Sequence, residues 1–560
     1  MPRFIFIAPA LVLVAAFSGT DESPGKGAFP PLFPRRELFL AAIRQCHAEA
    51  VPQKISGLTV PHHLLAADLL AAAFARVQGQ AYRRIIILSP DHFSRSRSPF
   101  AVTRRDFETA LGRLATDRSA VNLLKANPLV AESSLFSHEH AVQALLPFIA
   151  HYCARALIVP IAIRNDTQPA DWEALAQSLA PLLGPDTLLV QSTDFSHYLS
   201  HPEARRRDQE TLRVFSGGDP REVLSLREPD HLDSRGCQYL QLRLQREVFG
   251  AEPTVIANRN SQEYTAEPVK KTTSYIVQIY SAEPLHPAGA KSYFFGGDAF
   301  CGRQVATRLA TPEIREALRR QVLQITGGQA LILNLEGVLQ EQCPESPGPY
   351  TLCMASSMAL PLLKGLNARA VSLANNHSRD LGEDSYREMR RRLSEEGIAC
   401  LENWGVLDLG AFYLAGFTDV DNQSAEKSAR LTRQDLEGLA GLKKDKPLFA
   451  MMHWGREFAD RAGAREQALA ALLEEQGVEV IIGCHSHRAS RLEGTRRSCR
   501  VFSLGNFLFD QDSPRVSGIL LEAVFFPQGT YFLKVHPLEN LFRIPRSAVK
   551  RASGISPVFD

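Results

Sequence analysis

The sequence has almost no net charge and no dense cysteine pattern, and both absences exclude classes of protein. Its 63 basic and 61 acidic residues leave a formal charge of +2, too little for the broad basic face that binds nucleic acid. The nine cysteines are scattered and include no C-x-x-C pair, so a disulfide scaffold is excluded. Internal repeats and long low-complexity tracts are also missing. A 560-residue globular chain of this kind predicts about two to four domains.

Long hydrophobic runs are missing except at the N-terminus. There Arg3 precedes apolar residues 4–17, and small or polar residues 18–20 follow, a layout typical of a secretory signal. We predict that residues 1–20 are a signal peptide or N-terminal anchor and that the protein is exported to the periplasm or cell envelope, with cytoplasmic retention as the alternative. Membrane contact would then be limited to this segment if it stays uncleaved. In an exported protein, Cys343 and Cys353 are the nearest candidates for a disulfide, although sequence alone cannot pair them.

Two α/β-patterned halves flank a connector at residues 281–290, which holds two prolines and a glycine and shows no apolar periodicity. In each half, continuous apolar strands alternate with helical stretches, which indicates a sheet covered on both faces. We predict domains over residues 30–280 and 291–540 and a tail over 541–560. The predicted strands are 84–89, 156–160, 187–191, 292–296, 330–334, 370–374, 447–452 and 478–482, and the predicted helices of the first half are 64–78, 139–152 and 171–183.

Each predicted strand of the second half ends on a polar cluster. The clusters are Gly297-Asp298, Asn334-Leu-Glu336-Gly337, Asn375-Asn376-His377, His453-Trp454-Gly455 and Gly483-Cys-His485-Ser-His487. Residues just past the carboxyl ends of strands share one crevice, so these distant segments predict a single site. Carboxylate, amide and imidazole ligands suit manganese, zinc or iron, and two ions sharing a carboxylate could activate water and clamp a phosphoryl group. Taken alone, Asp298 is a turn former, Asn375-Asn376 a helix entry and His453 a core histidine.

Together with Val501-Phe-Ser-Leu-Gly-Asn506-Phe507 and Phe509-Asp510, this series resembles the CapA family of capsule and poly-gamma-glutamate synthesis proteins, which is related to calcineurin-like metallophosphoesterases. The resemblance covers about residues 290–515 and implies an αββα sandwich with a metal centre. It implies the metal ligands Asp298, Glu336, Asn376, His453, His485 and His487, catalytic roles for His377, Asp298 and His453, and pocket positions for Asn375 and Asn506. Glu336 would bridge the ions, and His377 would be a general acid or phosphate-orienting donor. Phe300 stands where those relatives have the histidine of Asp-x-His, which implies one ligand fewer.

The first half has its own series of polar residues after strands. His62 and His92 each follow an apolar run, and Glu139-His140, Asp194, His197 and Cys237 come later. Imidazole and thiolate ligands favour iron, copper or zinc, and Glu139 or Asp194 could orient a ligating ring. Taken singly, each histidine has a structural explanation, and Cys237 could be an inert buried thiol.

The ordered series from about residue 30 to 280 resembles the Memo family, also called AmmeMemoRadiSam system protein B. That family shares its α/β fold with class III non-haem iron extradiol dioxygenases. The resemblance implies the metal ligands His62, His92 and Cys237, and a pocket lined by Glu139, His140, Asp194 and His197. If Cys237 is misaligned, Asp233 or His231 is the substitute. Dioxygenase activity is not expected, because dioxygenases of this fold have a carboxylate where this chain would place the cysteine.

These inferences predict an exported two-domain metalloprotein. A Memo-like domain would be fused to a CapA-like, phosphoesterase-like hydrolase in envelope or capsular polymer metabolism, acting on a polymer of poly-gamma-glutamate type or a phosphorylated small substrate. The alternative is a non-catalytic metal-binding or redox accessory protein linked to a radical SAM system, with the CapA-like domain binding a polyanionic polymer. A third hypothesis, a cytosolic partner of a radical enzyme, requires the N-terminal run to be retained.

Overall fold

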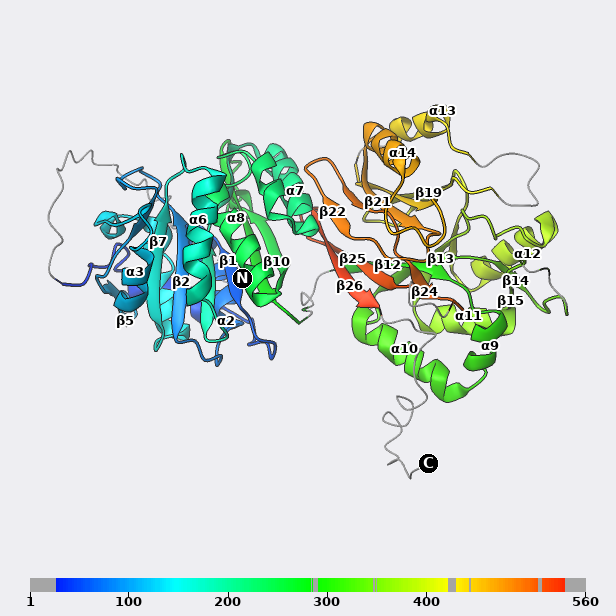
Figure 1. Cartoon of the computed structure of the whole chain (residues 1–560), viewed down its shortest axis with the longest axis horizontal. Coiled ribbons are helices and arrows are strands. Elements are labelled where there is room, and N and C mark those ends of the chain that lie inside the picture. The colour runs from blue at the N-terminus through cyan, green and yellow to red at the C-terminus, as the bar shows by residue number, and fades with distance from the viewer. Residues whose placement is uncertain are drawn as a thin grey trace, which may run out of the picture.

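A computed structural model describes residues 27–283, 285, 291–345, 348, 350–421, 430–442, 445–511 and 516–538. The chain forms two α/β lobes, one on either side of the junction between β11 (Thr272–Ser281) and β12 (Lys291–Ala299) (Figure 1). The predicted signal segment and tail, and most of the predicted connector, lie outside the described residues. None of the described helices combines the length and apolar character that a bilayer crossing requires.

The first lobe is built on one nine-stranded sheet. Its strand order is β10 (Glu252–Asn260), β11, β1 (Gly57–Val60), β8 (Thr187–Ser192), β2 (Arg84–Pro90), β7 (Leu157–Ile163), β3 (Phe100–Val102) and β6 (Val130–Glu132), and β9 (Phe195–Leu199) pairs with β11. The central strands β1, β8, β2 and β7 are parallel, and all residues of β1, β2 and β8 are buried. Their continuous apolar sequence follows from burial on both faces.

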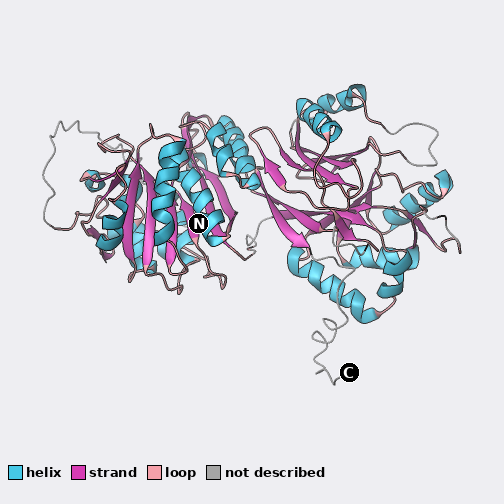
Figure 2. Cartoon of the chain, viewed as in Figure 1, coloured by secondary structure: helices cyan, strands magenta, loops and turns pink. Residues whose placement is uncertain are grey.

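Helices cover both faces of this sheet (Figure 2). One apolar core lies under α1 (Arg36–Arg44), α2 (Ala67–Ala75), α4 (His140–Gln143) and α5 (Leu146–Tyr152). A second lies under α3 (Arg118–Leu124), α6 (Pro169–Leu179), α7 (His201–Gly217) and α8 (Arg235–Leu244). A short hairpin, β4 (Phe107–Thr109) with β5 (Gly112–Leu114), packs at the side of the first core. The lobe is therefore a three-layer αβα sandwich, as the alternation of apolar strands and helices predicts.

The second lobe contains two main sheets. The first has the order β17 (Ala399–Leu401), β16 (Ala368–Ser372), β13 (Ala330–Leu335), β12, β25 (Gly518–Phe525) and β26 (Tyr531–Leu538), with β24 (Asn506–Leu508) paired to β12. The second has the order β18 (Val406–Asp408), β19 (Tyr413–Thr418), β20 (Leu448–His453), β21 (Val478–Cys484), β23 (Cys499–Val501) and β22 (Leu492–Gly494). A small parallel pair, β14 (Val338–Gln340) and β15 (Cys353–Ala355), stands apart from both.

Three apolar cores define the layers of this lobe. The two sheets pack face to face through a core rich in aromatic rings, including Phe295, Phe412 and Phe449. The outer face of the first sheet is covered by α9 (Arg303–Leu309), α10 (Pro312–Thr326), α11 (Ser356–Gly365) and α12 (Gly382–Glu395). The outer face of the second is covered by α13 (Arg433–Glu437) and α14 (Ala464–Glu475). The predicted αββα sandwich is thus confirmed.

The lobes are packed against each other through α7 and the hairpin of β25 and β26. The backbone of Tyr531 exchanges two hydrogen bonds with the Gln209 side chain, at 2.8 and 3.0 Å. The buried Arg213 guanidinium pairs with Glu479 of β21, and Phe526 and Phe532 join the α7 side of the first lobe's core. Because these contacts bury apolar and charged groups together, the lobes form one continuous structure.

Candidate metal centres

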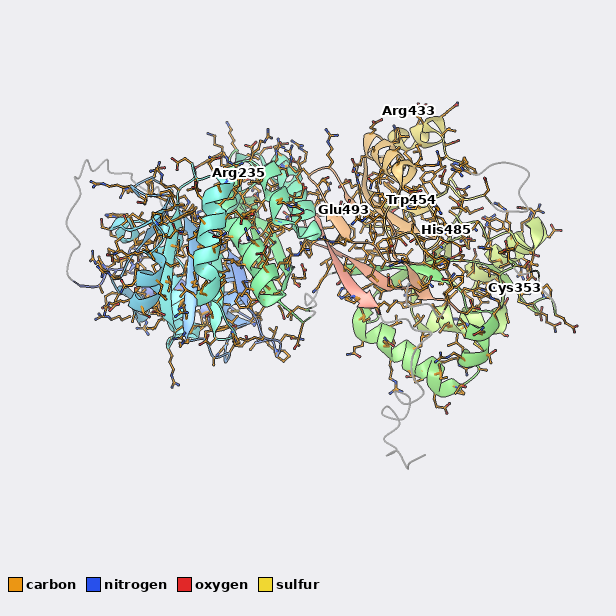
Figure 3. All side chains as sticks on the ribbon, in the orientation of Figure 1. Arg235, Cys353, Arg433, Trp454, His485 and Glu493 are labelled. Atoms are coloured by element: carbon orange, nitrogen blue, oxygen red, sulfur yellow. A yellow bond between two sulfur atoms is a disulfide. The ribbon has the colours of Figure 1, made fainter. Side chains whose placement is uncertain are left out.

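The polar clusters of the second half converge between the two sheets, at the carboxyl ends of their strands. Asp298 lies in β12, Glu336 directly follows β13, and His453 is the last residue of β20. The parallel register aligns Asp298 with Asn334 and His453 with Cys484, so the segments that follow these strands meet at one edge. Figure 3 shows His485, just beyond β21, inside this lobe. Residues that are distant in the sequence therefore lie close together because each is placed at the end of a strand.

Two overlapping groups of side chains in this region could hold metal ions. In one, the ligand atoms of Glu336, His453 and His485 lie within 4.8 Å of one another; in the other, the same holds for Asp298, Glu336 and His487. All five side chains are buried. Glu336 belongs to both groups, which is the arrangement a bridging carboxylate requires.

Amide side chains connect the two sheets around these groups. Asn376 Oδ1 lies 2.7 Å from His453 Nε2, and Asn375 Nδ2 donates to Asn334 Oδ1 at 3.1 Å. Asn334 Nδ2 in turn donates to Asp298 Oδ1 at 2.8 Å and lies 3.2 Å from His453 Nδ1. Asn334 is a site residue that the sequence reasoning placed in a cluster without giving it a role. The feature that could have identified it is that Asn334 is a polar residue inside an otherwise apolar strand.

The predicted pocket residue Asn506 and the predicted catalytic residue His377 contact different members of the two groups. Asn506 Oδ1 lies 2.8 Å from His487 Nδ1, which is also 3.1 Å from Asp298 Oδ2. The His377 ring is held by Asp380 and presents Nε2 4.0 Å from Glu336 Oε1. His377 therefore faces the carboxylate at the centre of the site while its other nitrogen is occupied.

The electrostatics of the site favour a bound cation. Burial, together with the nearby Asp298 carboxylate, raises the pKa of Glu336 well above its ordinary value. Burial and neighbouring histidines lower the pKa of His453 well below its ordinary value and that of His485 to about 4. Glu336 Oε2 and His485 Nδ1 are buried without a hydrogen-bond partner among the described residues. Neutral imidazoles, close carboxylates and unpaired ligand atoms fit a divalent ion that would satisfy all three.

His487 differs from the other two histidines. Burial alone would lower its pKa, but the hydrogen bond to Asp298 and the charges of Glu336 and Asp298 outweigh burial and raise the pKa to about 9. A protonated His487 ring would offset part of the negative charge of Asp298 and Glu336. A bound cation would take over that neutralising role.

The loop after β21 holds two of the candidate ligand histidines in a strained backbone conformation. His485 has φ 92° and His487 has φ 56°, in the left-handed region that costs a non-glycine residue about 1–3 kcal/mol. Phe458 also has a positive φ, 59°. It donates its backbone N–H to the carbonyl oxygen of Ser486, the residue between the two histidines, at 2.8 Å. Strain of this kind concentrates at functional sites. Gly483 makes the tight packing possible, since a Cβ there would lie 2.0 Å from Phe502 O.

Phe300, which replaces the histidine of Asp-x-His, does not enter the site as a ligand. It is fully buried in the core between the first sheet and its helices, 5.3 Å from the ring of Phe509. Its apolar side chain supplies no donor to a metal. Asp298, Glu336 and His487 still form a three-ligand group without it.

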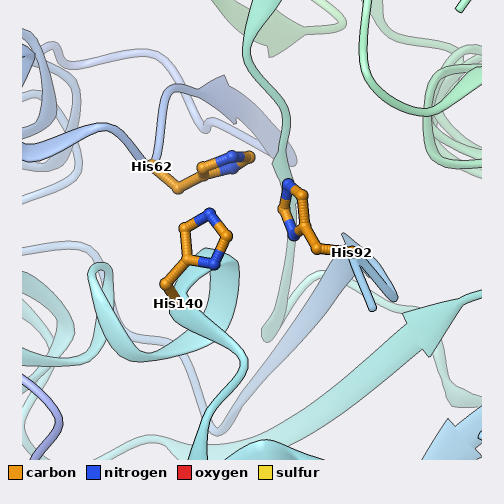
Figure 4. A group of neighbouring side chains, drawn as sticks. All are labelled: His62, His92 and His140. Carbon is orange, nitrogen blue, oxygen red and sulfur yellow. The ribbon is translucent and has the colours of Figure 1, made fainter. Parts of the chain in front are cut away.

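The first lobe gathers its histidines by the same logic. His62 and Asp194 each lie two residues past the paired ends of β1 and β8, where Val60 is in register with Ser192. His92 follows β2, and Glu139 and His140 begin α4. His62, His92 and His140 have ligand atoms within 4.8 Å of one another, and Figure 4 shows their rings turned toward a common centre.

Hydrogen bonds fix the orientation of two of these rings. The Ser192 hydroxyl donates to Ala141 O at 2.6 Å, so it accepts from His62 Nδ1–H at 3.2 Å. Glu139 Oε1 accepts from His92 Nδ1 at 2.8 Å, which is the orienting role expected for this carboxylate. Both rings therefore present Nε2, rather than Nδ1, to the pocket.

Carboxylates face these nitrogens. Asp233 Oδ2 lies 3.3 Å from His62 Nε2 and 3.8 Å from His92 Nε2, and Asp194 Oδ2 lies 3.5 Å from His62 Nε2. A lone pair facing a carboxylate needs a proton or a cation between them. Burial, with the added charge of Asp194, raises the pKa of Asp233 well above its ordinary value. Asp233 Oδ1 and His197 Nδ1 are buried without a partner in the described part of the chain, so the donor set fits a divalent ion.

The geometry favours Asp233 over the other residues considered for the third position. Cys237 lies in α8 and packs in an apolar core, and neither Cys237 nor Asp233 belongs to the three-histidine group. The ring of His231 is already occupied, because Nδ1 accepts from Arg227 N at 3.1 Å and Nε2 lies 2.9 Å from Glu210 Oε2. Asp233 is therefore the one of these three residues whose side chain is shown close to both rings, at 3.3 Å from His62 Nε2 and 3.8 Å from His92 Nε2.

Comparison with known proteins agrees with both lobes. Residues 34–277 match the family described as Memo-like protein, and residues 292–402 and 414–511 match bacterial capsule synthesis protein PGA_cap. A MEMO1 family protein of Thermotoga maritima is 31% identical over 140 residues, which are 24% of this chain and 50% of the relative. One of Ignicoccus hospitalis is 26% identical over 220 residues, 38% of this chain and 72% of the relative. Capsule biosynthesis protein CapA of Bacillus anthracis is 25% identical over 208 residues, 33% of this chain and 51% of the relative.

The matched regions span about half the length of the Thermotoga and Bacillus relatives. The two family matches occupy separate lobes, on either side of the junction between β11 and β12. The chain is therefore a fusion of a Memo family domain with a CapA-like domain of the bacterial capsule synthesis family.

Proposed function

We propose that the second lobe is a metal-dependent hydrolase of phosphoesterase type that acts in the metabolism of an envelope or capsular polymer. The observation that carries this proposal is the position of Glu336 in both three-ligand groups. Manganese, zinc or iron would be held by Asp298, Glu336, Asn376, His453, His485 and His487, which offer the mixed oxygen and nitrogen ligands these ions accept. Such ions, when bound, supply an activated water and stabilise charge on phosphoryl oxygens.

The chain's own residues contribute the remaining steps. His377 presents Nε2 toward Glu336 with its Nδ1 held by Asp380, so it can donate a proton to a leaving oxygen or orient a phosphoryl oxygen. Asn334 and Asn375 keep Asp298 and the β16 loop in place through the hydrogen bonds already described. The substrate would be a polymer of poly-gamma-glutamate type or a phosphorylated small molecule.

We also propose that the protein works outside the cytoplasm. The hydrophobic run at residues 4–17 supports this, and so does the disulfide between Cys343 and Cys353, because disulfides persist in oxidising compartments. Cys343 and Cys353 are the two cysteines that the sequence analysis named as the nearest candidates for a disulfide. The first lobe would hold iron, copper or zinc through His62, His92 and His140, with Asp233 beside them, in a metal-binding or redox role.

An accessory role is the second candidate function. Phe300 removes one ligand from the pattern of the metallophosphoesterases, which favours a lobe that binds a polyanionic polymer without hydrolysing it. The first lobe would then deliver or sequester metal, with a radical SAM system as a candidate partner.

Substitution of one ligand separates these candidates. Protein lacking residues 1–20 is loaded with manganese, zinc or iron and assayed with generic phosphodiesters. His485→Ala is expected to lower turnover by more than about 100-fold and to reduce bound metal, because it removes a ligand from the group containing Glu336. The exposed His151→Ala in the first lobe serves as the control. Equal turnover in His485→Ala and the unchanged protein would refute the hydrolase, and metal binding without any turnover would favour the accessory role.

A further inference from the structure

The small parallel pair β14 and β15 lies beside the candidate centre of the second lobe. β14 begins two residues after Glu336, and its first residue, Val338, is in register with Cys353. Val338 N donates to Leu352 O at 2.8 Å. Gly337 permits this approach, because it has φ 135° and a Cβ there would lie 2.9 Å from Leu352 O. The segment ending at Leu352 is thus seated directly against the chain that carries Glu336.

The backbone of Leu352 also contacts Asp380, the residue that orients His377. Leu352 N donates to Asp380 Oδ2 at 2.8 Å, and His377 Nδ1 lies 2.8 Å from that same oxygen. A carboxylate that accepts from one ring nitrogen fixes the direction of the other. Asp380 therefore links the backbone of Leu352 to the ring that faces Glu336.

The disulfide between Cys343 and Cys353 lies next to these hydrogen bonds in the chain. Cys353 directly follows Leu352 and is bonded to Cys343, ten residues earlier. The cross-link limits the freedom of the segment that presents Leu352 N–H to Asp380. The other seven cysteines, all of them described, are free thiols, so the bridged pair is the one disulfide among the described cysteines.

We propose that Asp380 is the positioning residue for His377 and that the Cys343–Cys353 disulfide makes this positioning sensitive to redox conditions. The inference rests on the proposed hydrolase and adds a form of regulation to it. A dithiol reductant supplies two electrons and two protons: the S–S bond breaks, Cys343 and Cys353 become thiols, and the reductant forms its own disulfide. The freed segment then holds Asp380 less firmly, and His377 loses its fixed orientation.

The test uses the full chain, metal-loaded, before and after treatment with dithiothreitol and its removal, alongside the double variant Cys343→Ser/Cys353→Ser. Hydrogen exchange measured by mass spectrometry is expected to increase at Leu352 and over residues 375–381 in the reduced protein and in the double variant. Turnover of a phosphodiester is expected to fall about 10- to 100-fold, with KM and metal content unchanged. Asp380→Asn is expected to show the same fall in turnover without reduction. The reductant is expected to lower its turnover no further.

Cys400→Ser removes a half-buried free thiol of the same lobe and should behave like the unchanged protein. Exchange at Leu352 that stays the same after reduction would overturn the proposal, as would full kcat in Asp380→Asn. If the oxidised protein hydrolyses nothing, the proposed hydrolase fails, but the exchange measurement still decides whether the disulfide holds the segment.

Discussion

Glu336→Gln is expected to abolish phosphodiester hydrolysis, lowering turnover by more than about 1,000-fold, and to remove metal from both three-ligand groups of the second lobe. The reason is that Glu336 is common to the two groups, so one substitution weakens both ions, whereas a loss of His453 or His487 affects only one. The amide keeps the shape of the side chain but removes the negative charge that a bridging ligand supplies. Metal content by elemental analysis and turnover are measured on the same preparation.

Glu522→Gln is the matched control for this variant. Glu522 is also a buried glutamate of the second lobe, hydrogen-bonded by Ser292 Oγ at 2.7 Å and paired with His536 Nε2 at 2.7 Å. Its substitution should leave metal content unchanged, although it should lower thermal stability. Metal retained in full by Glu336→Gln would contradict the bridging role.

The second large effect is expected in the first lobe, where Asp233→Ala should weaken binding of iron, copper or zinc by at least about 100-fold while Cys237→Ser leaves it unchanged. Asp233 Oδ2 faces the Nε2 atoms of His62 and His92, but the Cys237 side chain packs in an apolar core. Removing the Asp233 carboxylate takes away an anionic group that lies close to the Nε2 atoms of both rings. Binding is measured by calorimetric titration of the metal into the apo protein.

His231→Ala provides a comparison within the same segment. This ring is occupied by Arg227 and Glu210, so its loss should reduce stability without changing metal affinity. If Asp233→Ala binds metal as tightly as the unchanged protein and Cys237→Ser binds it more weakly, the Cys237 thiolate is a metal ligand and this prediction is wrong.

Apolar runs were a reliable guide to the sheets of both lobes. The strand predicted at 84–89 is β2 (Arg84–Pro90), and the one predicted at 478–482 is β21 (Val478–Cys484). Buried parallel strands need continuous apolar sequence, and polar residues at their ends stand out for that reason. The same contrast led to Asp298, Glu336, His453 and His485 as residues of one site.

Features that depend on packing between distant segments were beyond sequence reasoning. Asp233 was named only as a substitute for Cys237, because it lies in a loop that does not directly follow a strand and its approach to His62 and His92 has no periodic signal. The pairing of Arg213 with Glu479 joins residues 266 positions apart, and nothing in either local sequence marks the contact. Asp380 resembles an ordinary helix-entry acid until the fold brings Leu352 to it.

Helix boundaries show the same limit at a smaller scale. The helix predicted over residues 139–152 is divided into α4 (His140–Gln143) and α5 (Leu146–Tyr152), with Pro147 in the first turn of α5. Proline lacks an N–H and favours a helix start over a helix interior. The division places His140 at the start of a short helix, where its ring faces those of His62 and His92.

The most direct measurement of the central claim, that each lobe has an ion-binding pocket, is anomalous X-ray diffraction from crystals of the full chain grown with manganese or zinc. The account predicts anomalous peaks bounded by Glu336, His453 and His485 and by Asp298, Glu336 and His487 in the second lobe. It predicts a further peak bounded by His62, His92, His140 and Asp233 in the first. Crystals that show no peak within coordination distance of Glu336 and none beside His62 would contradict it.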